Sequence, residues 1–378
     1  MKYVRNCAVN VLLCLIVYFS VLSSIAAAAN TTAAADGFLK QLLSAEQHGM
    51  GGSFVGTSHG ANALGSNPAG ISTAEGNRFV IHATRFPRTL ALLSKPNHNA
   101  NYEDYSRYEQ RAYGIETLNY ALPMGKFGTV GLGLAFEQAG SFRRVDHSGK
   151  ALNSFPENNL ALGFSYGLKL FGSTRVGVDT KWLRSKVTDV EGTEHLGHGY
   201  AYNVGISQRI GDRTLVGIVA RNLSNGLSFS EPSIPNAMAR TIVAGIAHQH
   251  QISDVVTLLI GLDVHPPFRD GISANVGGEV WYRQRIGARI GYLRHTEKRY
   301  TRVFLLEDGV FEAEERLWKA EGLCFGLGIR LGGITLNAAY TPQFRPIATE
   351  DERIHIVQGE AVYTFSIGRT FGKPMLLL

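Results

Sequence analysis

The sequence predicts an all-β protein: a fourteen-stranded antiparallel transmembrane β-barrel, preceded by a hatch that plugs its lumen. Three observations support this fold class. Apolar residues alternate with small or polar residues in segments of about ten, which indicates strands with two different faces. Charged residues make up only 18% of the chain, below the roughly 25% of soluble proteins. Short and long connections alternate between the segments, which is typical of outer-membrane barrels.

The first 29 residues have the composition of a secretory signal peptide. Lys2 and Arg5 precede an apolar run, and a run of alanines up to Ala29 provides small residues for a signal peptidase. A retained anchor helix is the alternative. We expect residues 1–29 to be removed, which leaves Cys324 without a partner for an intrachain disulfide.

The next segment, residues 30–76, lacks the two-residue alternation. It contains a Gly-rich string beginning at Gly49 and an Asn67-Pro68 turn, both of which favour compact backbone outside a sheet. At membrane depth such backbone is tolerated only where protein surrounds it. We therefore expect residues 30–76 to form a hatch inside the lumen.

The barrel is predicted over residues 77–367, followed by a C-terminal tail at 368–378 whose apolar end has no explanation. Fourteen alternating segments are expected, which is an even number and places both termini on the short-turn side. They lie near 77–86, 112–122, 127–138, 158–168, 174–185, 200–210, 214–222, 239–250, 254–264, 272–282, 286–294, 322–331, 334–341 and 356–367.

The two faces of these strands distinguish a membrane barrel from a soluble β-sandwich. One face is apolar, and the other is rich in Gly, Ala and Ser with scattered charges, while most charged residues lie in the long connections. A barrel whose apolar face meets lipid explains this distribution, and its closure pairs every strand edge. The soluble sandwich remains the alternative.

Three motifs resemble the N-terminal signature of the FadL-type outer-membrane family. They are Gly49-Met50-Gly51-Gly52-Ser53-Phe54-Val55, Ala61-Asn62-Ala63-Leu64 and Asn67-Pro68-Ala69-Gly70-Ile71. That family includes transporters of long-chain fatty acids and aromatic hydrocarbons, PorV-like secretion proteins and spirochaete relatives. The resemblance implies a fourteen-stranded barrel with an N-terminal hatch in the outer membrane of a diderm bacterium, with both termini periplasmic.

The resemblance also implies passive transport of long-chain fatty acids or similar hydrophobic molecules. These molecules would be the ligands, and outer-membrane lipid would be a further partner. The expected ligand-binding residues are Phe54, Val55, Arg175, Lys181, Arg209 and Arg289, and the expected hatch or gate residues are Gly49, Gly51, Gly52, Asn67 and Pro68. The basic residues would bind a ligand carboxylate, or instead belong to a paired network that stiffens the wall. A kink in the third strand would open the wall sideways at Gly128, Gly131 and Gly133, unless these glycines only form the small lumenal face.

Other function classes remain open or are disfavoured. A PorV-like protein-binding barrel, a surface adhesin that contacts proteins through its long loops, and a hydrophilic porin are the alternatives. Without Lys2 and Arg5 the net charge falls from +6 to about +4, which is too small and too evenly spread to predict a nucleic-acid partner. Residues 56–60 match a nucleophile-elbow pattern, but the strand and helix that such a site needs are missing, so no enzyme and no cofactor is expected. His248 and His250, and likewise His195 and His198, lack further ligands, so no metal is expected.

Overall fold

A computed structural model describes residues 38–39, 43–86, 89–94, 106–110, 113–145, 151–188, 193–224, 226–229, 238, 240–266, 273–304, 311–342, 345–346, 353–358 and 361–371. The predicted signal peptide lies outside these residues, as does the last part of the predicted tail. Within the described residues, no helix has the length and apolar character needed to cross a membrane.

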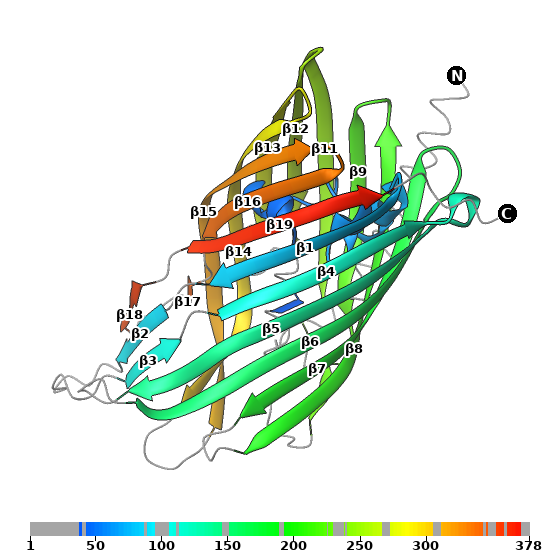
Figure 1. Ribbon diagram of the computed structural model, residues 1–378. Coiled ribbons are helices and arrows are strands. Elements are labelled where there is room, and N and C mark those ends of the chain that lie inside the picture. The colour runs from blue at the N-terminus through cyan, green and yellow to red at the C-terminus, as the bar shows by residue number, and fades with distance from the viewer. Residues whose placement is uncertain are drawn as a thin grey trace.

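Fourteen strands form a closed antiparallel barrel, which confirms the predicted fold class (Figure 1). They are β1 (Asn77–Phe86), β4 (Tyr113–Pro123), β5 (Thr129–Val145), β6 (Ala151–Lys169), β7 (Thr174–Thr188), β8 (Glu194–Ile210), β9 (Thr214–Leu223), β11 (Thr241–Ser253), β12 (Val256–Val264), β13 (Ala274–Tyr282), β14 (Ile286–Phe304), β15 (Phe311–Leu331), β16 (Ile334–Pro342) and β19 (Ala361–Phe371). Each contains or overlaps one predicted segment. The barrel closes where β1 pairs with β19, with Asn77 opposite Phe371.

Short strands and helices accompany the barrel. At one end lie β2 (Thr89–Ser94), β3 (Ser106–Gln110), β10 (Leu227–Phe229), β17 (Arg345–Pro346) and β18 (Arg353–Gln358). The helices are α3 (Ala45–Gly49) and the 3-10 turns η1 (Gly60–Ala63), η2 (Pro68–Thr73) and η4 (Gly125–Phe127). In Figure 1 the short turns lie at the upper end, and β5, β6, β14 and β15 extend toward the lower end.

The outer surface of the barrel is apolar, as a lipid-facing wall must be. Along β15, Leu323, Phe325, Leu327 and Ile329 are all exposed, and Leu327 reaches 66%. The residues between them, such as Cys324, are buried against the interior. The same alternation occurs around the barrel. A soluble sandwich would bury these side chains, so that alternative is excluded.

Several strand boundaries differ from the expectation, most of all in β14, β15 and β19. β14 and β15 continue as a paired hairpin to Phe304 and Phe311, where the sequence pattern predicted a long loop. β19 continues to Phe371, four residues beyond the predicted end at 367. The ring of Phe371 stacks on Phe79 of β1 with centroids 5.6 Å apart, so the last strand ends on an aromatic pair that closes the barrel. Hydrogen bonding to a neighbouring strand extends these strands beyond the point where apolar and polar residues stop alternating in the sequence.

Candidate functional site

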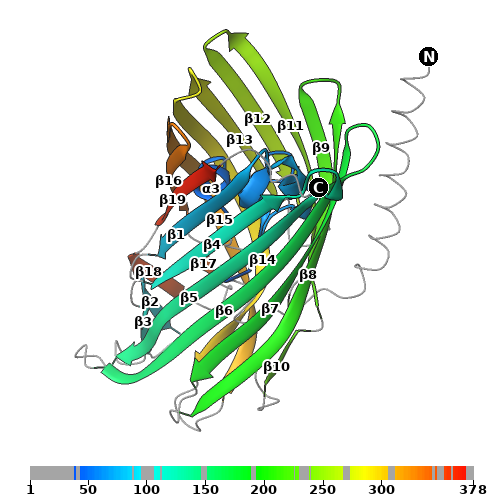
Figure 2. The same ribbon diagram turned by 45° about the vertical axis from the view of Figure 1, so that its right-hand side comes forward.

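The N-terminal segment, residues 43–76, lies inside the barrel near its short-turn end (Figure 2). Its compact backbone has local causes. Ser44 and Gln47 form a reciprocal capping box at the start of α3. At the start of η2, Oδ1 of Asn67 accepts a hydrogen bond from the backbone N–H of Ala69 at 3.2 Å, and Pro68 occupies the first helical position. The predicted turn at Asn67-Pro68 is therefore the start of η2.

Lumenal glycines give this segment the room that it occupies. α3 packs against β14, β15, β16 and β19, while η2 packs against β6, β7 and β8. A Cβ atom at Gly177 would collide with the backbone of Pro68, one at Gly205 with the Asn67 side chain, and one at Gly277 with the carbonyl of Met50. The high glycine content of the chain thus serves close backbone approach between wall and segment.

The three glycines predicted in the hatch have different roles. Gly51 and Gly52 have φ angles of 70° and 79°, in the left-handed region that side chains with a Cβ disfavour. Gly49 packs against Gly326 of β15, and a Cβ on Gly49 would lie 3.0 Å from the Gly326 Cα atom. The Gly-rich string is therefore a turn pressed directly onto the wall.

Asp263 of β12 binds residues 53–55 of the segment. Its side chain is completely buried. Oδ2 accepts hydrogen bonds from the backbone N–H groups of Phe54 at 2.6 Å and Val55 at 3.0 Å, and Oδ1 accepts one from the Ser53 hydroxyl at 3.4 Å. One wall carboxylate thus satisfies three donors of three consecutive residues.

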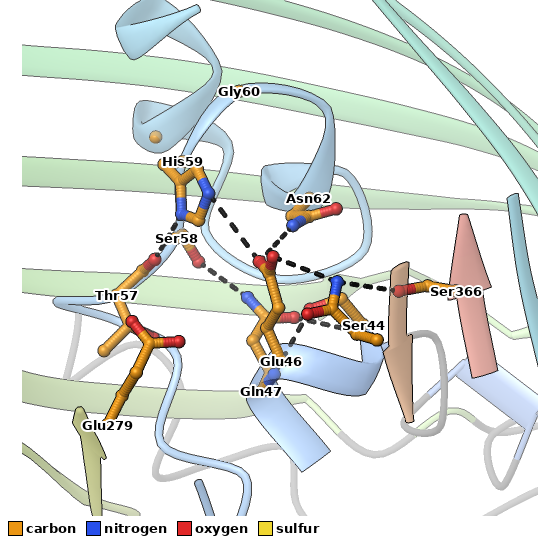
Figure 3. Close-up of polar contacts among 12 residues, drawn as sticks. Ser44, Glu46, Gln47, Thr57, Ser58, His59, Gly60, Asn62, Glu279 and Ser366 are labelled. Carbon is orange, nitrogen blue, oxygen red and sulfur yellow. Dashed lines mark hydrogen bonds and ion pairs between the residues drawn. The ribbon is translucent and has the colours of Figure 1, made fainter. Parts of the chain in front are cut away.

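Glu46 on α3 is the centre of a second polar contact (Figure 3). Its carboxylate accepts hydrogen bonds from the side-chain amides of Asn62 at 2.5 Å and Asn337 of β16 at 3.2 Å. His59 Nε2 lies 3.6 Å from Glu46 Oε2, and Arg289 Nη2 lies 4.0 Å from Glu46 Oε1. The Glu46 carboxylate therefore contacts side chains of both the segment and the barrel wall.

The charge of Glu46 is stabilised by its surroundings. Burial by itself would raise the pKa of this carboxyl group, but the surrounding cations outweigh burial and lower the pKa from 4.5 to about 2. They are Arg289, Arg78 and Arg330, together with His59 where its ring is protonated. Glu46 is consequently a buried anion at neutral pH.

His48 shows the opposite behaviour. Its Nδ1 atom lies 2.9 Å from the Thr364 hydroxyl on β19. Burial lowers the pKa of this imidazole from 6.5 to about 4, so His48 is neutral at pH 7.

The nucleophile-elbow match at residues 56–60 has a structural role. The Ser58 hydroxyl donates to the carbonyl of Phe54 at 2.6 Å and lies 2.8 Å from the Ser66 hydroxyl. His59 Nδ1 lies 3.0 Å from the Thr57 carbonyl, so this ring atom is engaged away from Ser58. These hydrogen bonds fold the segment and do not form a nucleophile–base pair.

The predicted ligand-binding cations are not gathered at one place. Lys181 forms an ion pair with Asp179, and Arg289 donates to Glu279 at 2.6 Å and to Asn337 at 3.0 Å. These two residues fit the paired wall network that the sequence left open.

Arg175 and Arg209 are different. Arg175 is half-buried, and its Nη1 atom has no hydrogen-bond partner among the described residues. Arg209 is exposed and donates to the backbone carbonyl of Asp212 at 3.3 Å. Both have lumenal positions near the short-turn end of adjacent strands β7 and β8. Neither of these two cations has a carboxylate partner within the described part of the chain.

Phe54 and Val55 are buried between the segment and the wall. They pack against Val219 of β9 and Val243 of β11, and the Arg221 guanidinium lies 5.1 Å from the centre of the Phe54 ring. Their side chains therefore anchor the segment in this structure.

A larger apolar cluster lies inside the barrel on the long-loop side of the segment. Phe38 and Leu39 pack there against inward-facing Ile115, Leu183 and Val362. The other members are Phe86, Ala135, Ala161, Ala201, Leu227 and Met238, with Tyr113 and Phe229 at the edge. We call this cluster the apolar chamber. Sequence reasoning missed it, although large apolar residues at lumenal positions, such as Ile115 and Leu183, were a usable signal.

The strand predicted to kink is continuous. β5 pairs with β4 and β6 without a register shift from Thr129 to Gln138. A Cβ on Gly131 would collide with Ile71, and one on Gly133 would lie 3.2 Å from Leu64, so both glycines accommodate the segment. Gly128 precedes the strand and has a φ angle of 88°. Gly131 and Gly133 therefore face the segment inside the barrel, whereas Gly128 lies in the turn before β5.

The two histidine pairs do not belong to a metal-binding group in the described residues. His248 and His250 are exposed on β11, where His248 Nδ1 lies 2.9 Å from the Thr214 hydroxyl. His195 and His198 both lie on β8. The described residues contain no group of three or more His, Cys, Asp or Glu side chains arranged to hold a metal ion.

Solved structures share this architecture. A Pseudomonas aeruginosa FadL homologue matches with a TM-score of 0.53 and 12% identity over 87% of this chain and 98% of that chain. The Pseudomonas putida toluene transporter TodX matches with a TM-score of 0.58 and 15% identity over 87% and 98%. The Ralstonia pickettii toluene transporter TbuX matches with a TM-score of 0.57 and 12% identity over 89% and 100%. No protein-family model and no curated protein matches the sequence. These likenesses show that the chain has the fold of FadL-type barrels.

Proposed function

Starting from this FadL-type fold, we propose that the chain is an outer-membrane channel for the passive uptake of hydrophobic small molecules, with the N-terminal segment as its hatch. The observation that carries the proposal is the apolar chamber. A channel for hydrophilic solutes has a polar lumen, whereas here Ile115, Leu183 and Val362 turn apolar side chains inward on the long-loop side of the hatch. Apolar molecules favour such a site over water because their apolar surface is buried there.

Phe38 and Leu39 occupy the chamber in this structure. In the proposed mechanism a ligand enters from the long-loop side and replaces these two side chains. The exchange conserves buried apolar area, so it costs little free energy. Displacement of residues 38–39 would then pull on the hatch, which the carboxylates of Asp263 and Glu46 help to hold against the wall.

The similar solved structures support this class of cargo, since two of them are described as toluene transporters. Long-chain fatty acids are the cargo that we propose for this chain, because unpaired Arg175 and Arg209 lie on the short-turn side of the hatch and suit a carboxylate. We also propose that this end, where both described termini of the barrel lie, faces the periplasm.

Direct binding tests the proposal. Purified protein is titrated with a fluorescent long-chain fatty acid, and Leu183→Gln is compared with Leu323→Gln. Leu183 lines the chamber, whereas Leu323 is exposed on the lipid-facing side. We expect the first variant to weaken binding at least tenfold and the second to leave it unchanged. Absence of fatty-acid and hydrocarbon binding to the unaltered protein would refute the proposal. In that case retention of a specific secreted protein would favour the PorV-like alternative.

A further inference from the structure

The short-turn end of the barrel exposes large apolar side chains that no described residue covers. Phe171 is 63% exposed, Leu331 62%, Ile252 56% and Phe127 54%. They lie on four different turns or strand ends around the barrel. Side chains of this kind are stable in contact with lipid and costly in water, so this end lies at a membrane–water interface.

Cations accompany the aromatic residues at the same end. Lys126 Nζ lies 5.2 Å from the ring centre of Phe127 in the β4–β5 turn. The Arg283 guanidinium lies 5.4 Å from the ring centre of Tyr282 in the β13–β14 turn. At the end of β19, the Arg369 guanidinium lies 4.8 Å from the ring centre of Phe371. We call these three pairs the basic–aromatic collar.

The collar belongs to an end with an excess of positive charge. Seven exposed cations lie there, namely Lys126, Lys169, Arg209, Arg213, Arg283, Arg285 and Arg369, against three exposed carboxylates, Glu75, Asp212 and Asp254, in the described residues. None of the seven forms an ion pair with a carboxylate of the described residues. Their charge is therefore available to an external anion.

We propose that the basic–aromatic collar binds the phosphate headgroups of anionic phospholipids in the membrane leaflet at the short-turn end. Each aromatic ring lies at the level of the headgroups, and the adjacent Lys or Arg reaches a phosphate oxygen. Anionic lipid attracts cations at its surface, so three such pairs spaced around the wall favour phosphatidylglycerol over zwitterionic lipid. The proposal depends on the transmembrane barrel and is independent of which solute the barrel transports.

Lipid competition tests the collar. The folded full-length protein is exposed to an equimolar mixture of phosphatidylglycerol and phosphatidylcholine, and the retained lipids are counted by native mass spectrometry. The collar variant Lys126→Gln/Arg369→Gln is compared with Arg213→Gln/Arg285→Gln, which removes the same charge at the same end from residues without a ring contact. We expect the unaltered protein to prefer phosphatidylglycerol. The collar variant should lose this preference roughly tenfold and the control variant less than twofold.

Three results would overturn the proposal. Equal loss in both variants would assign the preference to diffuse charge. No preference in the unaltered protein would exclude lipid selectivity. Retention of an acidic protein that depends on Arg213 and Arg285, without lipid preference, would assign this end to a soluble partner. Circular dichroism of each variant excludes unfolding as the cause.

Discussion

The carboxylate of Asp263 accepts a hydrogen bond from the backbone N–H of Phe54, with 2.6 Å between Oδ2 and N. The contact joins residues 209 positions apart in the sequence and connects the wall to the N-terminal segment. It also explains how a compact non-strand segment remains in the lumen, since its free backbone donors need acceptors from the wall.

Asp263→Ala should loosen the N-terminal segment. Loss of the carboxyl acceptor leaves two buried N–H groups without a partner, so we expect a destabilisation of about 1–3 kcal/mol, expressed as local opening. Hydrogen exchange at residues 53–55 measures this directly. Asp254→Ala, in the exposed β11–β12 turn, is the control. Equal exchange in both variants would show that the hydrogen bonds contribute nothing to docking.

Gly277→Ala and Gly278→Ala should differ sharply although they are adjacent. A Cβ at Gly277 collides with the Met50 carbonyl, whereas at Gly278 its nearest neighbour is the Leu259 carbonyl oxygen at 3.8 Å. We expect Gly277→Ala to cost roughly 1–3 kcal/mol and to make residues 43–76 sensitive to protease. Gly278→Ala should stay within about 0.5 kcal/mol of the unaltered protein. Protease resistance of Gly277→Ala would contradict the close packing.

Docking of the N-terminal segment should weaken with mild acid. The pKa of His48 is lowered from 6.5 to about 4, so the undocked state binds a proton in this pH range before the docked state does. Its stabilising contribution is complete above pH 6.5 and is lost as the pH falls toward 4, by roughly 3 kcal/mol in total. Hydrogen exchange of α3 at several pH values measures the slope. His48→Gln should reduce the slope in this range, and an unchanged slope would assign the dependence to another group.

A second loss of docking should follow at lower pH. The pKa of Glu46 is lowered from 4.5 to about 2, so its contribution is present above pH 4.5 and declines as the pH falls toward 2. Glu46→Gln removes the charge but keeps the size of the side chain, and it should abolish this second step while leaving that of His48. The same exchange experiment separates the two steps. A single step at pH 3 that persists in Glu46→Gln would refute the assignment.

Arg175 and Arg209 should recognise charge rather than apolar surface. We expect Arg175→Gln to weaken binding of a long-chain fatty acid by about tenfold, because one charge-assisted contact is lost, and to leave binding of the matching alcohol unchanged. Lys181→Gln, whose cation is already paired with Asp179, should affect both ligands equally and weakly. Equal loss of acid and alcohol in Arg175→Gln would show that the residue acts through structure alone.

Strand order and wall chemistry followed from the sequence because they depend on local periodicity. The alternation at Leu323, Phe325 and Leu327 predicts a lipid-facing strand wherever its partners lie. The Gly-rich string and the Asn67-Pro68 turn likewise predicted a compact segment, since φ preferences are properties of single residues.

Only the tertiary structure decided which lumenal cations pair with a carboxylate and which residues pack against the wall glycines. The sequence presented Lys181, Arg289, Arg175 and Arg209 as equivalent lumenal cations, and three-dimensional proximity to Asp179 and Glu46 separated the paired from the unpaired. The sequence left Gly131 and Gly133 as either a kink or part of a small lumenal face, and only the tertiary structure shows Leu64 and Ile71 packed against them. Ion pairing and steric fit depend on distances between residues that are remote in the chain, which periodicity does not encode.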